Sequence, residues 1–208
     1  AIIDDRTAYG QGVASVFKAT ALQKGVKVVG EEFTNDKATD FMAILTSIKN
    51  KKPDAIFYGG LDAQAGPMLR QMEQLGLSGV KYFGGDALCT EKLPELASKT
   101  QALKNVTCAT GGASVDKMQG GADWKKRYDA KFPGQFQIYS PYAYDATMVL
   151  ADAMKHANSV DPRVFNAFIS KTDYKGVTAN IAFTSKGELT TPAVTLYTYK
   201  DGHRVALN

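Results

Sequence analysis

The sequence predicts an α/β fold built on a parallel sheet, and three observations lead to it. Apolar strand-like runs alternate with helix-like runs through the first 110 residues. Each link between consecutive strands is too long for a hairpin, which is typical of β-α-β winding. The 208 residues are enough to bury one large core or two small ones.

Five strands and four intervening helices are predicted in the first half. The first strand ends at Ile2-Ile3, and a helix over about 12–24 follows, with Val13, Val16 and Phe17 on its apolar face and Gly25 at its end. Asp40 is expected to cap the second helix, which ends before Pro53. The other strands are predicted at 26–33, 54–60, 80–86 and 105–110, and the other helices at 64–75 and 91–98.

The pattern changes at the glycine-rich break over 110–114. Helices are predicted at about 117–131, from the end of an aromatic loop (132–145) to about 158, and at 162–171. Alternating residues near the carboxyl end, followed by Asp201-Gly202, predict a terminal hairpin. Because the helices of 114–190 have apolar faces and almost no sheet of their own, we expect this chain to be a fragment whose missing sheet lies upstream of Ala1.

Composition excludes two classes of protein. Hydrophobic residues make up 44% and charged residues 22% of the chain, and no apolar run approaches the roughly 18 residues that span a bilayer. The net charge is +4, and the lysines are scattered instead of forming an arginine-rich stripe. We therefore expect neither a membrane-spanning segment nor a nucleic-acid partner.

Cys89 and Cys108 are the two cysteines of the chain. No CxxC occurs, and the spacing fits neither a zinc site nor a thioredoxin-type motif. Two buried free thiols and one disulfide remain equal alternatives from the residues alone.

A glycine pattern near the start of the chain suggests a nucleotide-dependent enzyme as an alternative function. Gly10-x-Gly12-x-x-Ser15, with Glu31 and Glu32 about twenty residues on, is similar to a dinucleotide fingerprint. Its first glycine should follow the strand directly, but six residues intervene here, and the third glycine is a serine. A Rossmann-type oxidoreductase therefore remains the second hypothesis.

Other catalytic or metal chemistry has little support. His156 and His203 lie where solvent exposure is expected, and no GxSxG or HExxH motif occurs. Asp4-Asp5 could form a metal corner, but adjacent carboxylates more often accept hydrogen bonds within a loop. We expect no catalytic residues, no metal and no cofactor.

Three loops follow the carboxyl ends of predicted strands. They contain Tyr9, the segment 59–62 (Gly-Gly-Leu-Asp) and the segment 84–86 (Gly-Gly-Asp). Open α/β sheets bind ligands outside these strand ends, so the three loops should meet at one edge. An aromatic ring, glycine-exposed amides and a carboxylate suit a small zwitterion, the carboxylate pairing with its ammonium.

At these residues the chain resembles the periplasmic leucine/isoleucine/valine-binding proteins of ABC transporters. The resemblance is carried by "DDRTAYGQGVA", "DFMAILTSIKNKKPDAIFYGG", "GPMLRQMEQLGL" and "YFGGD". It implies the type 1 periplasmic binding fold, in which two Rossmann-like three-layer lobes with parallel sheets are joined by three crossings. Effector-binding sensors share this fold and remain a further alternative.

The resemblance also implies the domains and the partners. Residues 1–110 would form lobe two, 111–190 the carboxyl-terminal part of an incomplete lobe one, and 191–208 a hairpin returning to lobe two. The intact protein would be an exported, periplasmic monomer that captures an amino acid, branched-chain or aliphatic, by hinge closure and is recognised by an inner-membrane ABC permease. An oxidising compartment favours a Cys89–Cys108 disulfide.

Site residues follow from the same resemblance. Tyr9 matches a tyrosine that lines the cleft, and Asp86 matches the acidic residue that pairs with the ligand's ammonium. Leu61, with Gly60 and Asp62 beside it, stands where relatives often have an aromatic residue, which leaves the side-chain preference open. Gln137 or Phe136 falls near the contact from lobe one, and the groups that hold the ligand carboxylate would lie in the missing segment.

Overall fold

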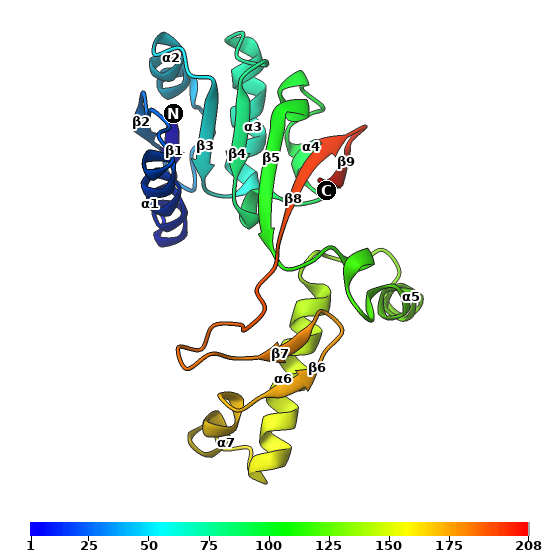
Figure 1. Cartoon of the computed structure of the whole chain (residues 1–208). Helices are drawn as coiled ribbons and strands as arrows, with labels where there is room; N and C mark the ends of the chain where they lie inside the picture. The colour runs from blue at the N-terminus through cyan, green and yellow to red at the C-terminus, as the bar shows by residue number, and fades with distance from the viewer. Residues whose placement is uncertain (208) are drawn as a thin grey trace. The chain divides into compact units, whose positions relative to one another are not determined.

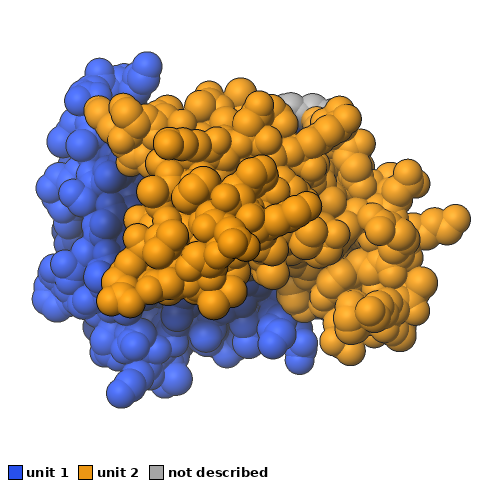
Figure 2. Space-filling model, turned by 90° about the horizontal axis from the view of Figure 1, so that it is seen from below, with its two compact units in different colours: residues 1–110, 196–208 blue, residues 111–195 orange. Residues whose placement is uncertain are grey.

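The computed structural model describes residues 1–207, which divide into two compact units. Unit 1 contains Ala1–Thr110 together with the chain from Leu196 onward, and unit 2 is Gly111–Thr195. Figure 1 labels the helices and strands, and Figure 2 colours unit 1 blue and unit 2 orange. Each unit is described separately below.

Unit 1 is built on a seven-stranded sheet in the order β2-β1-β3-β4-β5-β8-β9. The first five strands are parallel, as the sequence predicts, and β8 pairs with β9 as an antiparallel hairpin. The strands are β1 (Ile2–Asp4), β2 (Glu31–Phe33), β3 (Ala55–Gly59), β4 (Lys81–Gly84), β5 (Val106–Gly111), β8 (Val194–Lys200) and β9 (His203–Leu207). The helices are α1 (Ala8–Gln23), α2 (Met42–Asn50), α3 (Asp62–Gln74) and α4 (Leu93–Leu96).

Alternate residues of the strands face opposite layers of helices, as the two-residue period of a strand requires. On one face, Ile2 and Phe57 pack with Ala14 of α1. On the other face Tyr82 is fully buried, and its hydroxyl lies 3.1 Å from the sulfur of Met68 in α3. The fully buried side chains of this second layer include Ile3, Leu45, Ile48, Ile56, Tyr58, Met68, Leu69, Met72 and Tyr82. The unit is thus a three-layer α/β fold.

Helix α1 differs from the predicted helix at its start. It begins at Ala8 instead of about residue 12, because Thr7 caps it by accepting a hydrogen bond from the Gly10 amide. Tyr9 therefore lies in the first helical turn and not in a loop. Val16, which the sequence placed on the apolar face, is 68% exposed, since Ala14 and Phe17 face the sheet.

Strand β2 is also shorter than predicted. Only Glu31–Phe33 of the predicted 26–33 run pairs, since β1 offers just three residues, Ile2–Asp4, to its neighbour. The terminal hairpin was predicted correctly. Asp201 and Gly202 have φ of 52° and 78°, which is the left-handed pair that a two-residue turn of this type requires.

Unit 2 contains three α-helices, one short 3-10 helix (Val115–Lys117) and one small sheet. Its elements are α5 (Gly121–Lys131), α6 (Ser140–Ala157), α7 (Pro162–Ile169), β6 (Asp173–Lys175) and β7 (Asn180–Ala182). Helix α6 begins inside the predicted aromatic loop, with Pro141 in its first turn, where proline is favourable. The antiparallel pair β6–β7 was not predicted, because three-residue strands are too short to show an alternating pattern. None of the helices in residues 1–207 is long and apolar enough to cross a membrane.

Gly10 allows α1 to approach the sheet closely, which leads to a first prediction. A Cβ at this position would lie 2.5 Å from the Gly59 carbonyl oxygen and would overlap the Asp5 carboxylate. Gly10→Ala should therefore lower the free energy of unfolding by about 1–3 kcal/mol. Gly12→Ala, two residues further along the helix with no atom within 4 Å, is the control and should stabilise the helix by about 0.5–1 kcal/mol. Urea denaturation of both variants measures the difference, and equal stabilities would contradict the close approach.

Candidate functional site

The loop after β1 is organised so that Tyr9 projects from the carboxyl edge of the sheet. Asp5 is buried, and one of its oxygens accepts hydrogen bonds from the amide (3.0 Å) and the hydroxyl (2.6 Å) of Thr7. The Thr7 hydroxyl in turn accepts a hydrogen bond from the Gly10 amide at 2.9 Å. This chain of contacts fixes the first turn of α1, which carries Tyr9.

Tyr9 and Asp86, which are 77 residues apart in the sequence, meet at this edge. The Tyr9 hydroxyl donates to a carboxylate oxygen of Asp86 at 2.8 Å and accepts a hydrogen bond from the Ala87 amide at 3.3 Å. A Cβ at Gly85 would lie 2.5 Å from the Tyr9 hydroxyl oxygen, so glycine leaves room for the ring. The structure therefore places these two predicted site residues in direct contact.

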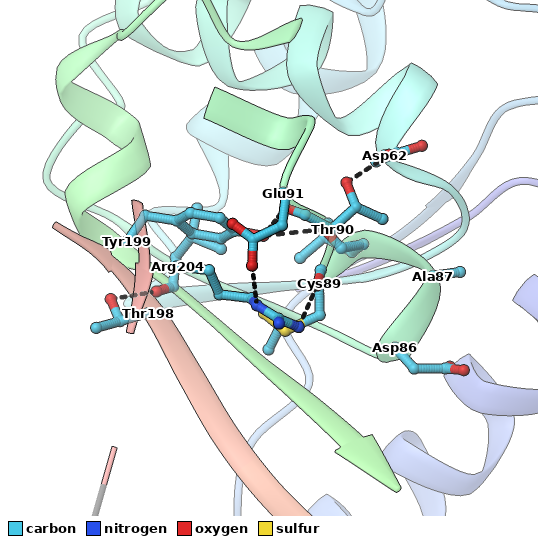
Figure 3. Close-up of a disulfide and its surroundings, with 12 residues drawn as sticks. Asp62, Asp86, Ala87, Cys89, Thr90, Glu91, Thr198, Tyr199 and Arg204 are labelled. Carbon is cyan, nitrogen blue, oxygen red and sulfur yellow. Dashed lines mark hydrogen bonds and ion pairs between the residues drawn. A yellow bond between two sulfur atoms is a disulfide. The ribbon is translucent and has the colours of Figure 1, made fainter. Parts of the chain in front are cut away.

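The predicted residues 60–62 lie at the start of α3. Leu61 is 40% exposed, and the ring of Tyr58 fills the space where a side chain at Gly60 would lie. Asp62 is the first residue of the helix, and its carboxylate accepts a hydrogen bond from the Thr90 hydroxyl at 2.5 Å (Figure 3). Asp62 thus ties two loops of the edge together, a role that the sequence did not suggest.

Gln137 and Phe136 belong to unit 2, and their described contacts lie within that unit. The ring centroids of Phe136 and Tyr128 lie 6.2 Å apart with the two rings nearly perpendicular, and the Lys125 ammonium lies 4.7 Å from the Phe136 ring centroid. Gln137 is exposed, and its backbone N–H donates to the Ser140 hydroxyl at 3.0 Å. These two residues remain candidates from the resemblance only.

Cys89 and Cys108 form a disulfide, with a Cα–Cα distance of 5.5 Å. It joins the segment after Asp86 to β5. The same segment is held by Tyr199 and Arg204 of the terminal hairpin (Figure 3). Sequence reasoning missed these two residues. The Asp-Gly pattern predicts where the hairpin turns, but it does not predict which loop the hairpin packs against.

Neither a dinucleotide turn nor a metal corner is formed near the start of the chain. Gly10 lies inside α1 instead of in a turn directly after β1, and the Asp5 carboxylate and the Gly59 carbonyl occupy the space where its Cβ would lie. Asp4 and Asp5 accept hydrogen bonds from the backbone two residues on, as the loop alternative predicted. Residues 1–207 contain no group of three or more His, Cys, Asp or Glu side chains that could hold a metal ion.

Unit 2 contains an apolar cavity of about 780 Å³. Its lining includes side chains of α6, α7 and the β7 region, among them Val149, Leu150, Ile169, Ile181, Phe183 and Leu189. Asp145 also lines this cavity, and its buried carboxylate accepts hydrogen bonds from the amides of Val177 (2.9 Å) and Thr178 (2.7 Å). Unit 2 thus contains an apolar cavity and, within its lining, a buried carboxylate whose hydrogen bonds hold residues 177 and 178 in place.

Comparisons with known proteins agree with this architecture. The family model described as "Periplasmic binding protein" matches residues 1–204. A "Leu/Ile/Val-binding protein homolog 1" of Brucella suis is 31% identical, and the match covers 97% of this chain and 53% of that protein. A "Leucine-, isoleucine-, valine-, threonine-, and alanine-binding protein" of Pseudomonas aeruginosa is 26% identical, and the match covers 98% of this chain and 54% of that protein. The chain therefore spans about half the length of the curated relatives that it matches.

Solved structures share the fold at lower sequence identity. A leucine-binding protein of Thermotoga maritima superposes with a TM-score of 0.89 at 24% identity, covering 100% of this chain and 59% of that one. A branched-chain amino acid transporter substrate-binding protein of Streptococcus pneumoniae, solved with isoleucine, gives a TM-score of 0.79 at 22% identity, covering 99% and 59%.

Proposed function

The chain belongs to the periplasmic binding protein family, and on this basis we propose that it is part of the solute-binding component of an ABC transporter for branched-chain amino acids. The whole protein would capture its ligand between two lobes by hinge closure. The family is non-enzymatic, so the oxidoreductase alternative is set aside.

The observation that carries the proposal is the contact between Tyr9 and Asp86 at the carboxyl edge of the parallel sheet. A carboxylate offers about four acceptor positions, so Asp86 can keep the Tyr9 hydroxyl as a donor and also accept from a ligand ammonium. The hydrogen bond from Tyr9 orients the carboxylate before the ligand arrives. Such preorganisation reduces the entropy cost of binding.

An aliphatic ligand side chain suits the neighbouring surface of unit 1. Leu61 is 40% exposed beside this edge, and the Tyr9 ring adds an aromatic face. The names of both relatives quoted above refer to leucine, isoleucine and valine, and the second also refers to threonine and alanine. We therefore assign branched-chain amino acids as the first ligand class to test.

The second unit is proposed to be the carboxyl-terminal part of lobe one, residues 111–190. Its apolar cavity of about 780 Å³ is lined by side chains that a sheet would normally cover. The relatives are about twice as long as the region that matches this chain. We propose that a segment preceding residue 1 in the full-length protein covers this cavity and supplies the groups that hold the ligand carboxylate.

Transport would follow from a shift between open and closed forms. A ligand that contacts both lobes only in the closed form favours closure by its difference in affinity for the two forms. The closed form would then be recognised by an inner-membrane permease, and the protein would act in the periplasm as a monomer.

Binding experiments on the full-length protein test this proposal. Thermal melting is measured with each of the twenty common amino acids and, for the oxidoreductase alternative, with NAD. Leucine, isoleucine or valine should raise the melting temperature, since a ligand that binds only the folded state stabilises it. The absence of any shift with all twenty amino acids would overturn the proposal.

A further inference from the structure

Three consecutive backbone carbonyls behind Asp86 accept hydrogen bonds from the terminal hairpin. The Tyr199 hydroxyl contacts the carbonyl oxygens of Thr90 (2.8 Å) and Leu88 (3.4 Å), and the Arg204 guanidinium donates to that of Cys89 (3.0 Å). Figure 3 shows Tyr199 and Arg204 on one side of this segment and Asp86 beyond it. We call residues 88–90 the anchored segment.

Arg204 is more deeply buried than an arginine on a two-residue hairpin normally is. Its side chain is 8% exposed, and its guanidinium lies 4.4 Å from the ring centroid of Tyr197. It donates to the Glu91 carboxylate at 3.1 Å in addition to the Cys89 carbonyl. When the N–H donors of a buried guanidinium all bond to one loop, they hold that loop in place. Any movement of the loop would leave buried charged donors unpaired, which costs free energy.

Other contacts hold the remaining sides of the anchored segment. The Tyr199 hydroxyl is buried, which raises its pKa above the usual value. The disulfide ties Cys89 to Cys108 of β5, and the Thr90 hydroxyl donates to Asp62. The segment is thus fixed from the hairpin, from β5 and from α3.

Asp86 is joined directly to this segment. Its backbone carbonyl accepts a hydrogen bond from the Cys89 amide at 2.9 Å, closing the short turn Asp86–Leu88. The backbone of Asp86 is therefore placed by residues 88–90, while its carboxylate is oriented by Tyr9. A shift of the anchored segment would move the carboxylate away from both Tyr9 and the ligand.

We propose that Arg204 and Tyr199 are positioning residues for Asp86, and that they set the affinity for the ligand ammonium without touching the ligand. The part of this inference that concerns affinity rests on the proposed function. The part that concerns the geometry of Asp86 does not, and it can be measured without any ligand.

The ligand-free experiment uses the full-length protein labelled with ¹³C-tyrosine. The ¹³Cζ resonance of Tyr9, assigned by its loss in Tyr9→Phe, reports the hydrogen bond from its hydroxyl. Arg204→Met keeps an apolar stem over Tyr197 but removes the donors, and Tyr199→Phe removes only a hydroxyl. Both should move the Tyr9 resonance in the direction that Asp86→Asn moves it. Lys200→Met, an exposed change on the same hairpin, should leave it in place.

The binding experiment uses leucine and a double-mutant cycle. Arg204→Met and Tyr199→Phe should each weaken leucine binding by about tenfold, since a misplaced carboxylate loses part of a charge-assisted hydrogen bond. Combined with Asp86→Asn, each should change the affinity by less than about twofold, because residues that act through one partner are not additive. Lys200→Met should bind leucine as the wild type does.

The outcomes separate the two proposals. If Arg204→Met and Tyr199→Phe leave the Tyr9 resonance unchanged, or weaken binding equally with and without Asp86→Asn, the positioning role is wrong. If the resonance moves but Asp86→Asn leaves leucine binding intact, the positioning role stands and the proposed site is wrong. Because Tyr199→Phe keeps the ring, it decides the question even where Arg204→Met fails to fold.

Discussion

Asp86→Ala in the full-length protein is expected to weaken leucine binding by more than about a hundredfold. In a closed, dry cleft the ligand ammonium would lose its charged partner, and breaking a buried ion pair on one side costs about 3–5 kcal/mol. Isothermal titration calorimetry measures the loss directly. An affinity within about threefold of the wild-type value would remove Asp86 from the site.

The control for this change is Asp54→Ala. Asp54 is an exposed acid directly before β3, at the amino end of a strand whose carboxyl end faces the site. It has the same charge as Asp86 but lies at the opposite edge of the same sheet, so its loss should change the affinity by less than about twofold. A large effect of Asp54→Ala would mean that net charge, and not the placement of Asp86, governs binding.

Asp145→Ala is expected to give the largest loss of stability, about 3 kcal/mol or more, in unit 2. Asp145 is 2% exposed and accepts hydrogen bonds from the Val177 amide, the Thr178 amide and the Thr178 hydroxyl. A Cβ at Gly176 would lie 2.5 Å from its carboxylate, so the loop is folded tightly around the acid. Alanine would leave these donors without their acceptor.

Hydrogen exchange on the full-length protein measures this effect locally. The amides of Val177 and Thr178 should lose protection in Asp145→Ala, while amides of unit 1 keep theirs. Asp152→Ala, on the same helix α6 but in a partly exposed pair with His156, should cost no more than about 1 kcal/mol. Unchanged protection at residues 177 and 178 would show that the carboxylate is not needed to hold this loop.

The elements that could be predicted from the sequence are those that local patterns define. Parallel winding, the helix stops and the Asp201-Gly202 hairpin depend on residues a few positions apart, and the structure confirms them. The meeting of Tyr9 and Asp86 could also be predicted, because the carboxyl ends of parallel strands share one edge. The family was likewise identified correctly from short motifs.

The features that could not be predicted depend on contacts distant in sequence. The early start of α1 comes from the Thr7 cap, a local contact that the sequence analysis overlooked, whereas the exposure of Val16 depends on the close approach of Gly10 to Gly59. The roles of Tyr199 and Arg204 depend on partners 109 to 115 residues away. The spacing of residues within a short segment cannot predict such a contact, because the two partners come together only after the sheet has formed.

The discontinuous unit 1 has a consequence for the order in which the protein matures. A ribosome makes residues 196–208 only after all of unit 2, so the strands β1–β5 emerge well before Tyr199 and Arg204. Until then the carbonyls of residues 88–90 have no hairpin donors, and this segment is held only by the Cys89–Cys108 disulfide and the hydrogen bond from Thr90 to Asp62. A chain interrupted before residue 196 would therefore contain strands β1–β5 but not the hydrogen bonds that Tyr199 and Arg204 make to residues 88–90.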